Sequence, residues 1–404
     1  MANNKIAVIG GGAAGFFAAI HAASIHSEVH LFEKSNKLLS KVKISGGGRC
    51  NLTHDCDYAS QLIQYYPRGG GSLKKGFEIF GTKDTRSWFE TRNVPLKVEA
   101  DGRVFPKSDN SQSIIECLLK EAHKKAIHIH LKKGLEQIEV QNRGFRLGFR
   151  NSEENFDKVI LACGGNPKKE NYQWIKDLGL KVIDPIPSLF TFNCPDYKMK
   201  SLMGLSVANG SVQIPGSKWK ESGPILITHW GFSGPGILKL SSWAARDLYD
   251  MDYNFPILIN WTNNKEEELR IAFEEYKTVH PKKKISSNPL FGIPSRLWHH
   301  LALKSGLKEE QLYLDLSKKS MNKFLETLLR DKHQVKGKTT FKEEFVSCGG
   351  VELSEIKLQS FECKKIKDLF IVGELLNVDA LTGGFNFQNA WTSGFLAGRA
   401  AKGG

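Results

Sequence analysis

Apolar and polar positions alternate along the first part of the chain in a way that predicts strands and helices in turn. Residues 5–9 form a short apolar, β-branched run, and residues 29–32 form a second one. Between them lie a glycine-rich segment, residues 10–15, and a stretch rich in Ala and Phe, residues 16–23. Short apolar runs next to glycine are typical of buried strands, and a longer Ala-rich stretch is typical of a helix. The pattern predicts an α/β arrangement of strand, glycine turn, helix and strand.

Further buried strands and a helix of the same α/β type are predicted much later in the chain. Residues 157–163 and 369–372 are further strand-like apolar runs, and residues 388–400 have the pattern of a helix. Between these runs, short alternating stretches such as 207–214 and 225–228, bounded by Gly and Pro, predict additional strands. The pattern therefore predicts one α/β domain that is interrupted by an insertion.

The second part of this insertion has a different periodicity. Apolar residues recur every three to four positions in residues 266–276, 296–303 and 321–330, which predicts helices. The insertion is thus expected to contain a strand-rich part followed by a helical part.

Composition restricts the class of protein. Of the 404 residues, 40% are hydrophobic and 25% are charged, which is typical of a globular chain and argues against a disordered or fibrous one. No apolar run approaches the roughly 20 residues that are needed to span a bilayer. The N-terminus also lacks the pattern of a cleaved signal. We therefore expect no membrane partner.

Cysteine usage indicates a reducing compartment. The seven cysteines are scattered and odd in number, and none belongs to a C-x-x-C pair. This distribution favours free thiols over a disulfide framework or a zinc site. We expect a cytoplasmic protein without a bound metal.

The glycine-rich segment has the spacing of a dinucleotide-binding turn. Gly10 permits the tight turn, Gly12 lets the backbone approach a pyrophosphate, and Gly15 lets the helix pack closely on the strand. The start of the helix offers free N–H groups to the phosphates. Glu33, 23 positions after Gly10, can accept hydrogen bonds from ribose hydroxyls, which favours FAD or NAD over NADP. The expected contacts here are Gly10, Gly12, Ala13, Ala14, Gly15, Glu33 and Lys34.

Three later segments favour FAD over NAD. Residues 41–51 carry three glycines beside Ser and Arg, which would form a backbone nest for an anion or, alternatively, a flexible loop. Residues 157–165 and 369–374 are strands that end in small residues and in Gly-Glu. The last helix would begin at the flavin and stabilise electron density on the reduced ring. The expected contacts are Ser45, Gly47, Gly48, Arg49, Cys50, Asn51, Ala162, Gly164, Gly373, Glu374, Asp379, Gly384, Phe385 and Asn386.

Four segments carry a more specific resemblance. They are K-I-S-G-G-G-R-C-N-L-T, G-R-V-F-P-K-S-D, T-H-W-G-F-S-G-P and G-E-L-L-N-V-D-A-L-T-G-G-F-N-F-Q. On these motifs, and over essentially its whole length, the chain resembles the BaiN/RdsA family of FAD-dependent oxidoreductases. Two positions depart from the family's usual pattern: Cys348 replaces a small or hydroxyl residue, and Asn377 replaces an acid. Neither departure removes a cofactor motif.

The resemblance implies a Rossmann-like, two-dinucleotide-type FAD-binding domain with a long insertion. The domain would comprise residues 1–190 and 346–404, and the insertion a β-barrel-like part, residues 191–262 and 337–345, and a basic helical part, residues 263–336. Some members are linked to reduction of bile-acid-type enones and others to dihydrouridine formation in large-subunit ribosomal RNA. The sequence has no second dinucleotide-binding unit, so we expect NADH or NADPH only as a transient electron donor.

Positive charge is concentrated in the insertion. The chain has a net charge of +14, and residues 276–342 contain 15 basic and 5 acidic residues, a net +10. Rings that could stack on bases are interleaved with them: Trp298, His299, His300, Tyr313 and His333. This pattern favours RNA binding. The alternatives are a solvated helical face and, for Trp298, a place in the core. The expected RNA contacts are Lys282, Lys283, Lys284, Arg296, Lys318, Lys319, Arg330 and Lys332.

These observations and the resemblance together lead to an expected activity. We expect an FAD-dependent oxidoreductase that reduces uridine to 5,6-dihydrouridine in large-subunit ribosomal RNA or its precursor, by hydride transfer from reduced flavin. Cys50 and His229 are candidate proton donors, although Cys50 could equally be a packing residue and His229 a structural one.

Other activities and the oligomeric state stay open. The chain could be a small-molecule flavoprotein reductase or oxidase that acts on an enone or an amine. It could also be a flavin-containing RNA-binding factor without catalysis. A flavin- and folate-dependent uridine methylase is disfavoured, because the resemblance runs to a different family. The sequence does not indicate how many copies of the chain associate.

Overall fold

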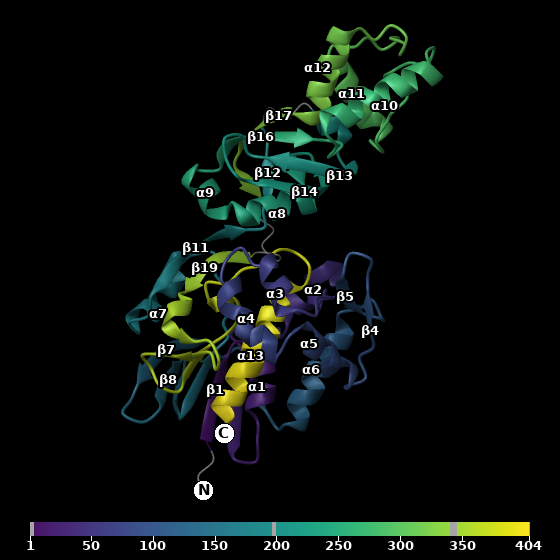
Figure 1. Ribbon diagram of the computed structural model, residues 1–404. Helices are drawn as coiled ribbons and strands as arrows, with labels where there is room; N and C mark the ends of the chain where they lie inside the picture. Colours follow the sequence, from purple (N-terminus) through teal and green to yellow (C-terminus); the bar gives the residue numbers. More distant parts are fainter. Residues whose placement is uncertain (1–3, 196–198, 340–345, 404) are drawn as a thin grey trace. The chain divides into compact units, whose positions relative to one another are not determined.

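The chain folds into two compact units (Figure 1). The computed structural model describes residues 4–195, 199–339 and 346–403. The first unit combines the described residues up to Ser188 with residues 346–403, and the second lies within residues 189–339. Each unit has its own central sheet and its own buried apolar side chains.

A mainly parallel sheet forms the centre of the first unit. In sheet order its strands are Ile356–Lys357 (β20), Glu362–Cys363 (β21), Leu369–Ile371 (β22), Lys158–Leu161 (β10), Asn4–Ile9 (β1), Ser27–Phe32 (β2) and His128–His130 (β6). The strands from β22 to β6 are parallel. Parallel strands covered on both faces read as continuous apolar runs, which is why the pattern of the sequence indicates them. The arrangement confirms the predicted Rossmann-like α/β class.

Two helices from opposite ends of the sequence lie side by side in this unit (Figure 1). Ala13–Ala22 forms α1, and Phe385–Lys402 forms α13, which confirms the predicted C-terminal helix. Gly394 and Gly398 allow the close approach. A Cβ at Gly394 would lie 2.7 Å from the carbonyl oxygen of Ala14, and one at Gly398 would overlap that of Ala18.

Smaller elements surround the central sheet. The remaining helices of the first unit are Ser40–Gly48 (α2), Ala59–Leu62 (α3), Gly70–Ile79 (α4), Thr82–Glu90 (α5), Gln112–Lys124 (α6) and Gln173–Asp177 (α7). Three small antiparallel sheets are formed by Thr53–His54 (β3), Arg103–Pro106 (β5) and Leu96–Val98 (β4), by Leu135–Val140 (β7), Phe145–Phe149 (β8) and Ser152–Phe156 (β9), and by Val182–Ser188 (β11) and Val346–Val351 (β19).

An antiparallel sheet forms the frame of the second unit. In sheet order its strands are Asp331–Lys336 (β17), Asn254–Asn260 (β16), Ser206–Gln213 (β13), Lys220–Ile227 (β14), Gly231–Ser233 (β15), Thr191–Asn193 (β12) and Lys338–Thr339 (β18). Alternate residues of β16 are buried, as expected for a strand with one face on a core. The basic residues of the insertion are not confined to its helices. Some of them lie on β17, which pairs with β16 in this sheet.

Among the described residues, five helices complete the second unit. They are Pro235–Trp243 (α8), Ala245–Asp250 (α9), Glu266–Val279 (α10), Ser295–Lys304 (α11) and Lys318–Leu329 (α12). The last three confirm the helices predicted from periodicity. Trp298 and Tyr313 are fully buried in the core, so the expectation that their rings stack on RNA bases is wrong. Among the described residues, no helix has the length and apolar character needed to cross a membrane.

Candidate functional site

The turn between β1 and α1 leaves room beside the start of the helix. Gly10 has a φ of +120°, and a Cβ there would overlap the carbonyl oxygen of Ala162. A Cβ at Gly15 would likewise overlap the carbonyl oxygen of Gly10. At Gly12, by contrast, the space within 4 Å of a Cβ position holds none of the described atoms. Open space beside the free N–H groups of a helix suits a diphosphate.

Glu33 follows β2 and reaches back to this turn. Its Oε2 accepts a hydrogen bond from the backbone N–H of Gly11 at 2.9 Å, and its Oε1 accepts one from Ser35 at 2.8 Å. The two bonds fix the carboxylate at the edge of the turn, and each oxygen keeps a further lone pair. Such a carboxylate can accept hydrogen bonds from ribose hydroxyls. Lys34, beside it, is exposed.

The second glycine-rich segment forms the end of α2 and departs from helical conformation. Gly46, Gly47 and Gly48 have φ values of +58°, +70° and +85°, which residues with a side chain rarely adopt. At Gly47 and Gly48 the space within 4 Å of a Cβ position again holds none of the described atoms. The hydroxyl of Ser45 donates to the carbonyl oxygen of Val42 at 3.0 Å and therefore points back into the helix. The segment presents open backbone, as an anion-binding nest requires.

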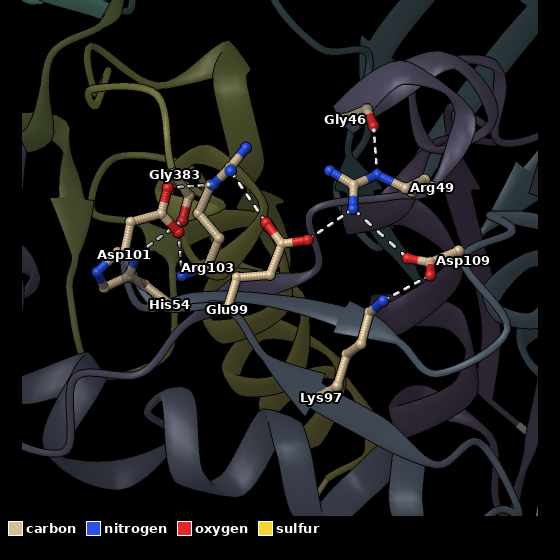
Figure 2. Close-up of polar contacts among 9 residues, drawn as sticks. All are labelled: Gly46, Arg49, His54, Lys97, Glu99, Asp101, Arg103, Asp109 and Gly383. Carbon is tan, nitrogen blue, oxygen red and sulfur yellow. Dashed lines mark hydrogen bonds and ion pairs between the residues drawn. The ribbon is translucent and has the colours of Figure 1, made fainter. Parts of the chain in front are cut away.

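Arg49 lies within a network of charged side chains (Figure 2). Its Nη1 donates to Oε1 of Glu99 at 2.6 Å and to Oδ1 of Asp109 at 3.4 Å. Its guanidinium lies 4.0 Å from the centre of the Phe105 ring. Arg49 thus ties the second glycine segment to the β4–β5 hairpin, and a phosphate would have to compete with two carboxylates. The predicted cofactor contact of Arg49 stays a prediction.

Glu374 follows β22 and bonds to residues of α2 and β19. Lys41 of α2 donates from Nζ to its Oε2 at 2.6 Å, and the backbone N–H of Ser347 donates to its Oε1 at 3.1 Å. Gly373, just before it, has a φ of +69°, and a Cβ there would lie 2.9 Å from that of Ala14. The end of β22 is therefore packed against the start of α1, where the pyrophosphate is expected.

Asp379 is fully buried and forms an ion pair with Arg68. The Nε of Arg68 donates to Oδ1 at 2.5 Å, and the hydroxyl of Ser188 donates to Oδ2 at 2.7 Å. Both carboxylate oxygens therefore have partners within the protein. This arrangement gives Asp379 a role in holding the loop that precedes α13, and its predicted contact with the cofactor stays a prediction.

The start of α13 is joined to the strand that follows the second glycine segment. Gly384 has a φ of +89°, and a Cβ there would lie 2.6 Å from the carbonyl group of Thr53. With its amide oriented by its neighbours, Asn51 accepts a hydrogen bond from the N–H of Gly384 at 3.1 Å. The side chain of Asn386 bonds to both the N–H and the carbonyl oxygen of Ala380, each at 3.0 Å. The motifs around residues 51 and 384 thus form one structure.

His54 is a candidate that the motifs do not single out. Its Nδ1 lies 3.2 Å from the carbonyl oxygen of Gly383 (Figure 2). Its ring lies 4.6 Å from that of Phe385. Burial lowers the pKa of His54, which favours a neutral ring whose Nδ1–H donates to Gly383. Its Nε2 faces Gly102, where a Cβ would lie only 2.5 Å away. The position of His54 directly after the motif K-I-S-G-G-G-R-C-N-L-T is the signal that could have indicated it.

The two predicted proton donors have different surroundings. Cys50 is completely buried, and burial raises the pKa of its thiol to about 12, which favours the packing interpretation. His229 is exposed in the turn between β14 and β15 of the second unit, with its ring 4.3 Å from that of Trp230. The role of each in catalysis stays a prediction.

The second unit contains a cavity of about 990 Å³, which we call the basic cavity. It is lined by Cys194, Met199, Ser201, Leu202, Ser286, Ser287, Ser295, Arg296, His299, His300, Leu303, Lys304, Lys332, His333 and Gln334. Buried Asp331 compensates part of its charge by pairing with Lys304 and, at 2.9 Å, with His333. Lys332 is exposed and has no ion-pair partner among the described residues. The cations Arg296, Lys304 and Lys332 in this lining, beside its apolar side chains, suit a ligand that carries a negative charge.

Two helices of the second unit begin with basic residues. Arg296 lies in the first turn of α11, and Lys318 and Lys319 lie in that of α12. A cation at this end opposes the helix dipole and costs stability. Basic side chains in the first turn become favourable where an anion binds to the start of the helix.

The other predicted RNA contacts are more dispersed. Lys282 and Lys283 are exposed on the segment between α10 and α11. Lys284 pairs with Glu310 at 2.5 Å, and Arg330 pairs with Glu326 at 2.7 Å. Of the predicted set, only Arg296 and Lys332 are among the residues that line the basic cavity.

The whole chain matches one family model. A model described as the HI0933-like protein Rossmann domain matches residues 4–400. The chain belongs to this family. It is 25% identical to the 3-dehydro-bile acid delta(4,6)-reductase of Clostridium scindens, over 98% of this chain and 99% of that protein. It is 26% identical to the ribosomal RNA dihydrouridine synthase of Haemophilus influenzae, over 96% of each.

A solved structure has the same fold as this HI0933-like protein. The 3-ketosteroid delta1-dehydrogenase of Sterolibacterium denitrificans is similar with a TM-score of 0.54 at 10% identity, covering 99% of this chain and 100% of that one. At this identity the likeness concerns the fold alone.

The HI0933-like family consists of FAD-dependent oxidoreductases, and the first unit fits this cofactor. The carboxyl ends of β1, β2, β10 and β22 meet at one edge of the sheet and bring together Gly10, Gly12, Ala13, Ala14, Gly15, Glu33, Ala162, Gly164, Gly373 and Glu374. At Gly164, as at Gly12, a Cβ would meet open space. Within the described residues of the first unit, three buried side-chain oxygens lack a hydrogen-bond partner: Ser347 Oγ, Asn377 Oδ1 and Asn389 Oδ1. Unpaired buried oxygens beside Glu374 are expected where a polar ligand completes a site.

Proposed function

We propose that this protein is an FAD-dependent reductase that converts uridine to 5,6-dihydrouridine in large-subunit ribosomal RNA or its precursor. The observation that carries the proposal is the basic cavity together with the basic starts of α11 and α12. The Haemophilus influenzae relative, whose name states this activity, supports it over nearly the whole chain.

The distribution of charge favours a polyanion over a small acid. Phosphate contacts made by Lys and Arg supply most of the affinity of proteins for nucleic acids. A single carboxylate would be neutralised by one or two cations, whereas the insertion has a net charge of +10 between residues 276 and 342. Basic side chains are also placed where they destabilise the free helices, which indicates a ligand that compensates for this cost.

The chemistry divides between the cofactor and the chain. When bound, FAD supplies the hydride that reduces the uracil ring, and NADH or NADPH is the proposed source of its electrons. The first unit would hold the diphosphate beside Gly12 and the ribose at Glu33. A side chain or a water must deliver a proton to C5 of the base from about 3 Å. Cys50 and His229 are the predicted donors. His54, whose Nδ1 lies 3.2 Å from the carbonyl oxygen of Gly383, holds the flavin-binding segments together instead.

A target uridine in folded RNA must also be made accessible. Extruding a base from its stack costs a few kcal/mol, which binding energy has to supply. Contacts of the phosphate backbone with the second unit can provide this energy without touching the reacting base. The proposed division is therefore flavin binding and hydride transfer in the first unit and binding of the RNA backbone in the second.

Reduction of a small enone is the second candidate. The Clostridium scindens relative, a bile acid reductase by name, is 25% identical and covers 98% of this chain. Met199, Leu202 and Leu303 also give the basic cavity an apolar part. An enone substrate would not require the basic starts of α11 and α12. Substitution of these basic residues therefore separates the RNA substrate from the enone substrate.

Deleting the gene and measuring dihydrouridine in ribosomal RNA by mass spectrometry tests the proposal. We expect the deletion strain to lack one or more dihydrouridines of the large subunit, and a plasmid with the wild-type gene to restore them. A plasmid carrying Gly12→Val should not restore them, because the substitution blocks the diphosphate position. Unchanged dihydrouridine in the deletion strain would exclude the RNA substrate.

A further inference from the structure

Four side chains with metal-binding chemistry meet at one edge of the central sheet of the first unit. Glu28 and His30 belong to β2, and His128 and His130 belong to β6, the edge strand. Strands expose alternate residues on one face, and His30 pairs in register with His128. All four side chains therefore lie on the same face of the sheet, where three histidines and a carboxylate are concentrated.

The positions of the ligand atoms are close to those of a metal site. One ligand atom each of Glu28, His30 and His128 lies within 4.8 Å of the others. The rings of His30 and His128 are 4.8 Å apart, and Oε1 of Glu28 is 2.7 Å from Nε2 of His30. Glu28 and His128 are exposed and free to adjust, whereas His30 is 7% exposed and held in place.

Hydrogen bonding orients His30 as metal-ligating histidines are oriented. Its Nδ1 lies 3.0 Å from Nε2 of His130 and its Nε2 faces Glu28. Nε2 of His30 and Oε1 of Glu28 are therefore close enough to share one bound ion. A partner that holds the second ring nitrogen is a regular feature of histidine metal ligands.

We propose that Glu28, His30 and His128 bind a divalent transition-metal ion, with His130 positioning His30. Two imidazoles and one carboxylate are ligands for Zn²⁺, Ni²⁺ or Cu²⁺ and are a poor set for Mg²⁺ or Ca²⁺, which prefer oxygen. Water would complete the coordination. The ion would fasten the edge strand β6 to β2.

This site is separate from the cofactor position. Glu28 is near the beginning of β2, whereas Glu33 follows its end, and five residues of extended chain span about 16 Å. The proposal is therefore independent of the proposed RNA substrate. Cofactor content serves as a control, since loss of the metal ligands should leave it unchanged.

Calorimetric titration of the tag-free flavoprotein with Zn²⁺ tests the site. We expect one ion per chain in the wild type, no such binding in the double variant Glu28→Gln/His128→Gln, and an affinity lowered about 10- to 100-fold in His130→Gln. His26→Gln removes an exposed histidine just before β2 and should bind like the wild type. The cysteines are intact in every variant, so they cannot cause a difference.

Thermal unfolding provides a second readout. Zn²⁺ in excess should raise the unfolding temperature of the wild type and of His26→Gln, but not that of the double variant. Equal Zn²⁺ binding in the wild type and the double variant would overturn the proposal, as would the absence of binding in the wild type at millimolar Zn²⁺.

Discussion

At the scale of single residues, glycines and buried charges determine what the first unit can hold. Gly10 and Gly15 are required by the fold, because a Cβ at either would overlap a backbone oxygen. A Cβ at Gly12 would meet none of the described atoms within 4 Å, so the fold itself does not require glycine there. We infer that the missing side chain leaves room for the ligand. Asp379 is different again, since its buried carboxylate supports the loop through Arg68.

Replacing Gly12 by Val should abolish flavin binding with little effect on folding. The new side chain would occupy the open space at the start of α1, where the diphosphate is expected. The measurement is flavin absorbance per purified chain, together with the unfolding temperature. Gly71→Val in α4 is the matched control, because a Cβ there also meets open space. Full flavin content in Gly12→Val would place the diphosphate elsewhere.

Breaking the ion pair between Arg68 and Asp379 should destabilise the first unit strongly. Asp379→Asn leaves the Arg68 charge without its buried partner, which costs about 3 kcal/mol or more of unfolding free energy. The exposed pair of Arg146 with Glu139 is the comparison, and Glu139→Gln should cost less than about 1 kcal/mol. Denaturant unfolding of both variants measures the difference. Similar small losses in both would refute a structural role for Asp379.

At the scale of elements, packing of α1 on α13 gives the first unit a sensitivity to acid. His21 in the last turn of α1 donates from Nδ1 to the carbonyl oxygen of Phe17 at 2.7 Å and packs 4.8 Å from the ring of Phe395. Burial lowers the pKa of His21 from 6.5 to about 4. The unfolded chain therefore takes up a proton at higher pH than the folded chain does.

Stability should consequently fall as the pH is lowered from 6.5 to 4. A depressed pKa means that the contribution of His21 is fully present above pH 6.5 and is lost in this window, with a magnitude of about 3 kcal/mol. In His21→Gln, which can keep the bond to Phe17, the fall should be smaller by about that amount. Chemical unfolding at several pH values tests this, with His26→Gln as control. Identical pH profiles for His21→Gln and the wild type would contradict it.

The start of α12 allows function and stability to be separated. Lys318→Glu/Lys319→Glu should stabilise the second unit by a few tenths to about 1 kcal/mol, because acids favour a helix N-terminus. The same change should weaken binding of a ribosomal RNA fragment and flatten its salt dependence. Lys74→Glu/Lys75→Glu in α4 changes the net charge equally and is the control for fluorescence anisotropy titrations. Equal loss of affinity in both variants would remove the specific role of α12.

Local sequence pattern and glycine spacing predict the elements of this molecule well. They do not predict its long-range contacts. The elements β1, α1, β2, β10, β22 and α13 follow from apolar runs and helical periodicity. The pairing of Arg49 with Glu99, and of Asp379 with Arg68, depends on residues far apart in the sequence and has no local signal. Trp298 illustrates the same limit, since an aromatic residue among lysines can face either the core or the solvent.

At the scale of the whole molecule, the two units differ in charge and in proposed task. Of the net +14, residues 276–342 contribute +10, and the basic cavity lies within the second unit. The first unit has the open backbone and unpaired oxygens that fit FAD. A reductase with this division would bind its substrate mainly through phosphates and react with only one base.

The most direct test is turnover with purified components. The flavoprotein would be incubated with NADH or NADPH and large-subunit ribosomal RNA from the deletion strain, and dihydrouridine would be quantified by mass spectrometry. We predict dihydrouridine formation that requires the flavin, disappears in Gly12→Val, and is reduced in Lys318→Glu/Lys319→Glu but not in Lys74→Glu/Lys75→Glu. Absence of dihydrouridine, with rapid reduction of a small enone by the same preparation, would contradict the account.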